Sequence, residues 1–182
     1  MFNVFKNKQK LQESKAKPLS DDLSFSVPKK IDPVCYIYAD GGCRRNGRAD
    51  SVGGYGVVIE HEGHVEEYYG VECGTTNNIM ELLACIKALE LITNTDIPIS
   101  LTTDSKYVVL GVNIWRYDWE SNGWVSKAGN TIKNKDLWIE LFYQVDRFKD
   151  ITIHHCYGHK DNVGNNRADE LANKAMDLVD KF

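Results

Sequence analysis

The sequence has no uninterrupted apolar run near the roughly 18 residues that a membrane-spanning helix needs, and only four of its 182 residues are proline. Its first ten residues, MFNVFKNKQK, carry lysines with no apolar segment behind them, so no secretory signal is expected. Five cysteines are present, none in a CxxC pair or at zinc-finger spacing with histidine, which favours reduced thiols. We therefore expect an intracellular protein without a membrane partner, most simply in the cytoplasm, with the nucleus or an organelle as open alternatives.

Several catalytic motifs are missing as well. The sequence contains no Gly-rich phosphate-binding loop, no HExxH and no GxSxG, which are the motifs of nucleotide triphosphatases, zinc proteases and serine hydrolases respectively. The net charge of −4 argues weakly against a protein that coats nucleic acid indiscriminately. It does not argue against a nucleic-acid enzyme, because a site rich in carboxylates lowers the net charge by itself. What is present, 42% hydrophobic and 26% charged residues, is typical of a globular domain.

Charge divides the chain into two parts. The first twenty residues hold five lysines and one glutamate, and no clear periodicity follows them up to residue 33. We interpret residues 1–33 as a flexible basic extension, either inert or helping to hold a polyanion. Residues 34–182 are then one compact domain of ordinary size.

The domain alternates between strand and helix patterns. Apolar or alternating runs predict strands, capped periodic runs predict helices, and crossover helices between strands imply an α/β domain with a partly parallel sheet. The strands are expected at 34–39, 53–59, 64–71, 97–103 and 151–157, and the helices at 75–91, 105–115, 137–148 and 166–179.

Four acidic residues stand at the ends of these elements. Asp40 and Asp104 follow apolar strands, and Glu81 and Asp169 lie near the starts of helices. Taken singly, each has an ordinary explanation, such as solvation or compensation of a helix dipole, which contributes about 0.3–1 kcal/mol. Taken together, they fit one pocket at the carboxyl end of the sheet.

Carboxylates that converge repel one another unless a cation lies between them. Oxygen ligands of this kind select Mg²⁺ or Mn²⁺, and two such ions about 3.5–4 Å apart suit phosphodiester hydrolysis. The four acids therefore predict a metal-dependent hydrolase that cleaves phosphodiester bonds.

Four segments also carry a family resemblance. They are Tyr38-Ala-Asp40-Gly-Gly-Cys, Thr75-Thr-Asn-Asn-Ile-Met-Glu81-Leu-Leu-Ala, Thr102-Thr-Asp104-Ser, and Gly158-His159 followed by Asn166-Arg-Ala-Asp169-Glu-Leu-Ala. In this order and spacing they resemble type 1 ribonuclease H over about residues 34–180. Residues 115–135 are similar to the extra helix and loop, called the handle, of the cellular form.

The resemblance implies a ribonuclease H-like α/β fold, with a central five-stranded mixed sheet flanked by helices, in a monomer. It implies an endonuclease that hydrolyses the RNA strand of RNA/DNA hybrids and leaves 5′-phosphate and 3′-hydroxyl ends. Asp40, Glu81, Asp104 and Asp169 match the carboxylates that bind two Mg²⁺ ions, with Mn²⁺ as a substitute. His159 matches a loop histidine that assists proton transfer or product release, with an ordinary polar loop residue as the alternative.

The resemblance further implies how the hybrid is held. The RNA 2′-hydroxyl is accessible across the wide minor groove, whereas the DNA strand is held by its backbone. Asparagines also serve in turns and caps, and tryptophan in core packing, so these roles stay open beside substrate binding. The matching residues are Gly41, Asn46, Asn77 and Asn78 for the hybrid, Thr76 and Asn134 for a phosphate pocket, and Tyr107 and Trp119 for the deoxyribose strand.

Three departures from the family pattern stand out. Gly74 occupies a position where an arginine often completes the phosphate pocket, and Lys106 one where glutamine is common. The handle is weakly basic, with four cationic and two acidic residues over 115–135. We therefore expect weaker hybrid binding than in a strongly basic relative, unless the Lys-rich extension compensates.

Two other interpretations stay open at this point. A hybrid-binding module with a decayed site would keep the fold but not turnover, and the intact set of acids argues against it. A transposase, integrase or resolvase on a related fold would cut double-stranded DNA, and fold analogy alone does not separate these enzymes.

Overall fold

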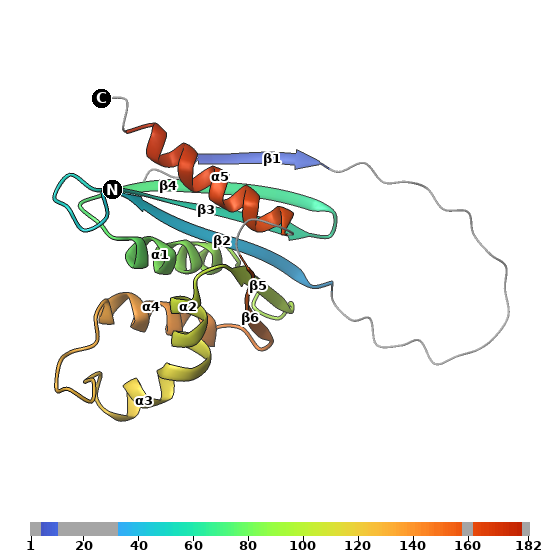
Figure 1. Ribbon diagram of the computed structural model, residues 1–182. Coiled ribbons are helices and arrows are strands. Elements are labelled where there is room, and N and C mark those ends of the chain that lie inside the picture. Colours follow the sequence, from blue (N-terminus) through green and yellow to red (C-terminus); the bar gives the residue numbers. More distant parts are fainter. Residues whose placement is uncertain (1–4, 11–32, 158–161, 180–182) are drawn as a thin grey trace, which may run out of the picture.

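A computed structural model describes residues 5–10, 33–157 and 162–179, which are organised by one mixed sheet (Figure 1). β2, β3 and β4 are antiparallel neighbours, whereas β5 runs parallel to β2 and β6 parallel to β5. Together β2 to β6 form the expected five-stranded mixed sheet. The full strand order is β1-β4-β3-β2-β5-β6, with β1 (Phe5–Lys10), β2 (Cys35–Arg44), β3 (Val52–His61), β4 (His64–Cys73), β5 (Ile99–Thr103) and β6 (Ile151–His155).

β1 is an addition that the sequence analysis did not expect. It lies within residues 1–33 and pairs antiparallel with β4, with Phe5 opposite Tyr69 and Lys10 opposite His64. This pairing covers the backbone edge of β4, which would otherwise be open to other strands. The domain boundary near residue 34 stays a prediction.

Helices cover both faces of the sheet (Figure 1). α1 (Asn77–Glu90) contacts β2, β3 and α4 (Lys135–Asp146), which explains why α1 is apolar on most of its circumference. α5 (Val163–Asp177) packs on the opposite face, against β2 and β3. None of the helices among the described residues is long and apolar enough to cross a membrane.

The expected helix at 105–115 is divided. It consists of α2 (Lys106–Leu110) and a π-helical turn, η1 (Gly111–Trp115), and α3 (Arg116–Ser121) follows directly. Gly111 lies against the buried indole of Trp138, and a Cβ at this glycine would fall 2.0 Å from the ring. The chain therefore needs a glycine where this helical segment crosses α4.

Two hydrophobic cores lie on either side of the sheet. The larger one, under α1 and α4, includes the fully buried side chains Ile37, Leu82 and Trp138. The smaller one, under α5, includes Val58 and Leu171. The larger core buries side chains of both β2 and β5, the strands that lead to Asp40 and Asp104, whereas the smaller core covers the other face of β2 and β3.

Close backbone contact seats α5 on β3. A Cβ at Gly56 would lie 2.0 Å from the carbonyl oxygen of Ala168, and one at Gly54 would lie 2.1 Å from that of Ala172. Such approaches are possible only without side chains on the strand. The backbone of α5 therefore lies directly against that of β3.

The start of α5 corrects the sequence analysis, which expected the helix to begin at residue 166. The helix begins at Val163, and the side chain of Asn162 caps it by accepting a hydrogen bond from the N–H of Asn165 across 3.0 Å. Asp169 consequently lies in the second turn. Compensation of the helix dipole, which acts in the first turn, does not explain an acid there.

Candidate active site

Asp40 lies inside β2, not at its end as the sequence analysis expected. β2 pairs with β5 only from Cys35 to Tyr38, but its pairing with β3 continues to Arg44. Asp40 therefore stands just beyond the point where the parallel pairing stops. The residue is buried, with only 8% of its surface exposed.

Gly41 brings α1 to this point of the strand. A Cβ at Gly41 would lie 2.2 Å from the carbonyl carbon of Met80 and 2.5 Å from the backbone nitrogen of Glu81. Gly41, predicted to bind substrate, thus has a packing role as well. Because the glycine permits this contact, the backbone of Glu81 lies directly beside Gly41, the residue that follows Asp40.

The surroundings of Asp40 disfavour the negatively charged form of its carboxyl group. Burial raises the pKa of Asp40 to about 7, and the carboxylates of Asp104, Asp169 and Glu81 add to the increase. A hydrogen bond from the backbone of Gly41 acts in the opposite direction. The other three predicted acids are thus close enough to act on Asp40, although the four come from β2, α1, the end of β5 and α5.

Glu81 is held by two neutral donors. The hydroxyl of Ser105 donates to Oε2 across 2.6 Å, and Nδ2 of Asn77 donates to Oε1 across 2.8 Å. Burial raises the pKa of Glu81, the bond from Ser105 lowers it, Asp104 raises it and the bond from Asn77 lowers it. Ser105 is not among the residues predicted for the site, although a serine directly after a strand-end acid is a signal for a helix cap.

Asp104 follows β5 as expected, and β6 fixes its backbone. Nε2 of His155 lies 3.1 Å from the carbonyl oxygen of Asp104, and the N–H of Cys156 donates to the carbonyl of Thr103 across 3.0 Å. On α5, Oδ1 of Asp169 accepts from Nδ2 of Asn173 across 2.9 Å. Each acid therefore has an anchor of its own.

The donor set is suited to a hard cation. Four carboxylates supply the oxygen ligands that Mg²⁺ and Mn²⁺ prefer, and the pKa of Asp40 is raised first by burial and then by its neighbouring carboxylates. Within the ranges 5–10, 33–157 and 162–179, no three His, Cys, Asp or Glu side chains are placed so as to hold one ion. Each oxygen of Glu81 accepts one hydrogen bond, from Ser105 or from Asn77, and keeps a second lone pair with which it could bind a cation. His159 belongs to residues 158–161, which lie outside the described part of the chain.

The predicted hybrid-binding residues gather at the start of α1. The backbone N–H of Asn77 donates to Oδ1 of Asn46 across 3.0 Å, which joins residues 31 positions apart. Thr76 caps α1 through its side chain, which accepts from the N–H of Ile79. Asn78 is exposed and lines a hollow with Glu81 and Asp104. The amides thus act in capping and turn contacts and are also placed beside the acids.

A second group of predicted residues forms around Tyr107. Its hydroxyl accepts from Nε1 of Trp138 across 3.0 Å and from Nδ2 of Asn134 across 3.4 Å. Trp119 packs against Trp138, with ring centroids 5.1 Å apart, and against Trp115 and Trp124. Tyr107 and Asn134 are therefore brought together, while Trp119 belongs to an aromatic cluster between α3 and α4.

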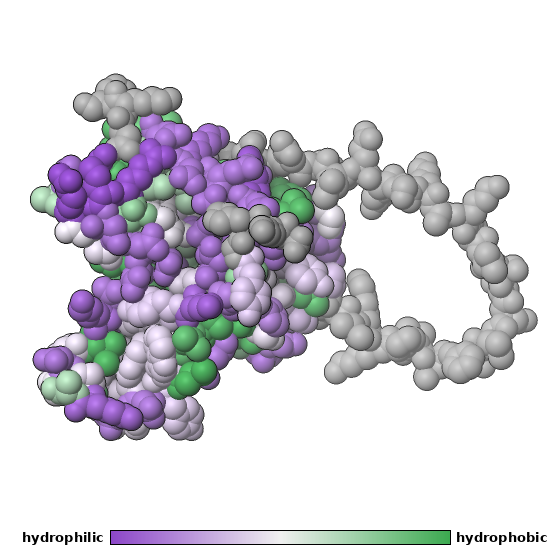
Figure 2. Space-filling view, in the orientation of Figure 1, coloured by the Kyte–Doolittle hydropathy of each residue, from purple (hydrophilic) through white to green (hydrophobic). Residues whose placement is uncertain are grey.

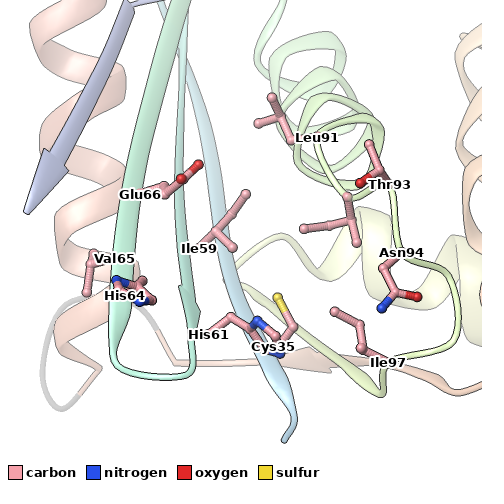
Figure 3. Close-up of a pocket in the computed structure, with 11 residues that line it drawn as sticks. Cys35, Ile59, His61, His64, Val65, Glu66, Leu91, Thr93, Asn94 and Ile97 are labelled. Atoms are coloured by element: carbon pink, nitrogen blue, oxygen red, sulfur yellow. The ribbon is translucent and has the colours of Figure 1, made fainter. Parts of the chain in front are cut away.

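A larger hollow of about 680 Å³ lies at the opposite end of the sheet (Figure 3). It is bounded by the start of β2 at Cys35, the β3–β4 turn with His61 and His64, and the segment that follows α1. Glu66 is the one acid among the described residues that line it, and its carboxylate accepts a hydrogen bond from Tyr68. This hollow is remote from Asp40 and contains none of the predicted site residues.

The surface adds little to this assignment. Figure 2 shows one face of the molecule, mostly purple and white, with green patches that stay separate from one another. The exposed apolar side chains include Ile114, Tyr117 and Tyr143 on η1, α3 and α4. The acids at the end of β5 therefore remain the best candidate for a site.

Comparison with known proteins gives the family of the chain. The family model described as RNase H matches residues 32–177. The chain belongs to the RNase H family. A relative named ribonuclease H, from Ruthia magnifica subsp. Calyptogena magnifica, is 44% identical over 143 residues, which cover 79% of this chain and 95% of the relative. The predicted family and enzyme class, a ribonuclease H, are thus confirmed.

Solved structures agree with this RNase H fold. LC9-RNase H1, described as a type 1 RNase H with the type 2 active-site motif, is 32% identical, with a TM-score of 0.71 over 85% of this chain and 75% of that one. The foamy viral protease-reverse transcriptase in complex with RNA/DNA hybrid has a TM-score of 0.72 over 90% of this chain and 22% of that one. At 24% identity, the viral enzyme supports the fold alone.

Proposed function

We propose that this ribonuclease H is an endonuclease that hydrolyses the RNA strand of RNA/DNA hybrids and leaves 5′-phosphate and 3′-hydroxyl ends. The observation that carries the proposal is the burial of Asp40 beside three other carboxylates, with a pKa raised to about 7. Buried carboxylates that repel one another destabilise the fold, and groups with such perturbed pKa values cluster at functional sites. Binding of divalent cations is the use that the donor set favours.

Asp40, Glu81, Asp104 and Asp169 would hold two Mg²⁺ ions, with Mn²⁺ as a substitute. The chemistry that such ions supply is activation of the attacking water and stabilisation of charge on the leaving oxygen. Within the chain, Ser105 and Asn77 orient Glu81, and the contact between β6 and the backbone of Asp104 keeps that acid in place. His159 is proposed to assist proton transfer or product release. Water is the nucleophile, so no covalent enzyme intermediate is expected.

Two groups of residues, at the start of α1 and around Tyr107, are proposed to bind the substrate. Asn77 and Asn78 lie beside the acids, and Asn46 bonds to the backbone of Asn77. Amides at these positions can donate to and accept from the RNA 2′-hydroxyl. Thr76 with Asn134 and Tyr107 with Trp119 are proposed to hold the DNA strand by its backbone and sugars. One residue of each pair, Asn134 or Trp119, belongs to the proposed handle at about residues 115–135.

Gly74 and the N-terminal extension bear on affinity. Gly74 is exposed and has a φ of 67°, and at this position the phosphate pocket lacks a guanidinium. We expect the Lys-rich extension, residues 1–33, to compensate for part of this loss. Deletion of residues 1–30 should then raise the KM at low salt, and an unchanged KM would refute compensation. We further propose a monomer that acts in the cytoplasm.

Four matched, end-labelled duplexes test the function. They are RNA/DNA, RNA/RNA, DNA/DNA, and DNA with one embedded ribonucleotide, each incubated with Mg²⁺, Mn²⁺ or EDTA. Metal-dependent cutting of the RNA/DNA duplex alone, lost by at least about 100-fold in Asp40→Asn, is the expected result. Hybrid binding without cutting would indicate a binding module, and DNA/DNA cutting would indicate an integrase-like enzyme.

A further inference from the structure

A hollow of about 470 Å³ adjoins the proposed catalytic acids. Glu81 and Asp104 line one part of it, and Lys106, His155 and Tyr157 line another. Tyr157 is 85% exposed, and its ring packs edge-on against His155 with centroids 5.3 Å apart. The hollow therefore extends from the acids to an open, partly aromatic rim.

Lys106 is the one lysine or arginine among the described residues that line this hollow. Its side chain is exposed, and within the described ranges no hydrogen bond or ion pair engages its ammonium group. It forms no ion pair with Asp104 or Glu81, although all three line the same space. A cation beside two carboxylates, paired with neither, is available to an incoming anion.

The backbone that carries Lys106 is firmly placed. The preceding Ser105 bonds to both Glu81 and the N–H of Val108, and the backbone of Asp104 contacts His155. The backbone of Lys106 is thus held in place next to the acids. A flexible stem lets it reach a phosphate as a mobile point charge.

We propose that Lys106 binds the phosphate of the RNA strand that neighbours the scissile one. This inference rests on the proposed function, because the acids place the scissile phosphate at the inner end of the hollow. Neighbouring phosphates of one strand are closer to each other than to phosphates across the wide minor groove of a hybrid, so the RNA strand is favoured. Lys106 is thereby a residue that sets affinity for the substrate, without a role in the bond cleavage itself.

The first test is the salt dependence of kcat/KM for a hybrid at fixed Mg²⁺. Each phosphate contact contributes about 0.7–0.9 to the slope of log affinity against log salt. Lys106→Gln should reduce the slope by about that amount, whereas Lys106→Arg should retain it. An unchanged slope in Lys106→Gln would overturn the proposal.

Lys149→Gln is the matched control, because it makes the same change in net charge. Lys149 is fully exposed and pairs with Asp96 across 2.6 Å. It lies next to Asp150, whose carbonyl accepts from the N–H of Ile99 at the start of β5, at the end of the sheet away from Asp104. The control should keep the wild-type slope. A control that loses as much slope as Lys106→Gln would mean that only overall charge matters, which also overturns the proposal.

The second test removes the charge from the substrate. The substrate is a hybrid with a short run of ribonucleotides at one cleavage position, carrying a single neutral methylphosphonate at successive phosphates. One neighbouring position should slow the wild type several-fold and leave Lys106→Gln unaffected. Equal penalties in both proteins at every position would refute the contact. A wild type that cleaves no hybrid at all would instead refute the proposed function, so the two failures are distinguishable.

Discussion

The hydroxyl of Ser105 donates to Oε2 of Glu81 across 2.6 Å and accepts from the N–H of Val108 across 3.2 Å. One buried side chain therefore begins α2 and orients a carboxylate on α1. The two elements are separated by β5 in the chain, so this contact ties the local cap to the tertiary placement of the acid. Stability and activity depend on the same hydroxyl.

Ser105→Ala should consequently affect both properties. Loss of an N-cap typically costs about 1 kcal/mol in the free energy of unfolding. Loss of the donor to Glu81 should reduce kcat by roughly tenfold, the equivalent of about 1.4 kcal/mol. Urea unfolding and single-turnover cleavage of a hybrid measure the two effects.

Ser121→Ala is the control for this serine. The Ser121 hydroxyl donates to the carbonyl of Asp118 at the exposed end of α3, away from the acids. Both stability and kcat should stay within error of the wild type. A Ser105→Ala protein with wild-type kcat would show that Glu81 needs no orientation from α2.

Asp40 predicts a pH dependence of stability. The pKa is raised from 3.8 to about 7 by folding, so the folded protein retains a proton that the unfolded chain loses between these values. The free energy of unfolding should therefore fall as the pH rises from about 4 to 7. Asparagine stays neutral, so Asp40→Asn should be more stable than the wild type at pH 8, by on the order of a few kcal/mol, and equally stable below pH 4. Urea unfolding in EDTA across this range measures the difference.

An exposed acid provides the comparison. Asp118→Asn on α3 makes the same chemical change at an exposed position, and it should shift stability by less than about 0.5 kcal/mol at every pH. If Asp40→Asn behaved like Asp118→Asn, neither burial nor the neighbouring carboxylates would raise the pKa of Asp40 in solution.

Added Mg²⁺ should remove part of this electrostatic cost. Binding to the folded state alone raises stability by RT ln(1 + [Mg²⁺]/Kd), so the Tm of the wild type should rise with metal concentration. Asp40→Asn removes a proposed ligand and the principal unfavourable charge, and its Tm should rise much less. Thermal unfolding at fixed ionic strength, with KCl as the balancing salt, is the measurement. Equal increases in both proteins would show that Asp40 is not a metal ligand.

The sequence predicted the acids better than it predicted their surroundings. Asp104 was found because strand alternation ends at it, and α1 because its caps and apolar period agree. The continuation of β2 past Asp40 was not visible, since it depends on pairing with β3 as far as Arg44. Composition predicts that this strand ends before Asp40, but pairing with β3 extends it.

Contacts between distant residues account for the other differences. Gly164 was expected in a polar loop, yet it lies in α5 and packs closely against Tyr38, since a Cβ there would fall 2.4 Å from the ring. The bond between Asn46 and Asn77 likewise joins segments that no local pattern connects. Periodicity locates helices and strands, whereas such close approaches exist only once the chain is folded.

Gly56 offers a direct test of one such approach. Gly56→Ala places a Cβ 2.0 Å from the carbonyl oxygen of Ala168, so α5 must move or the strand must bend. We expect a loss of about 1–3 kcal/mol in the free energy of unfolding, or more if α5 detaches. Gly42→Ala on β2 is the control, because its Cβ would meet only the Cε of Met176 at 3.6 Å, an ordinary contact. Equal stability of the two variants in urea unfolding would contradict the packing of α5 on β3.

Tyr107 links the core of α4 to the proposed DNA-strand surface. Trp138 is fully buried, and its Nε1 donates to the Tyr107 hydroxyl, which also accepts from Asn134. Tyr107→Phe leaves the indole N–H buried without this acceptor, at a cost of about 1–3 kcal/mol, and it releases Asn134. The KM for a hybrid should therefore rise while kcat changes little, because the acids are untouched. Tyr143→Phe removes a hydroxyl from a ring on α4 that is 62% exposed, and both its stability and its KM should match the wild type. If Tyr107→Phe were as benign as Tyr143→Phe in urea unfolding and in KM, the hydroxyl would neither satisfy Trp138 nor position Asn134 for the substrate.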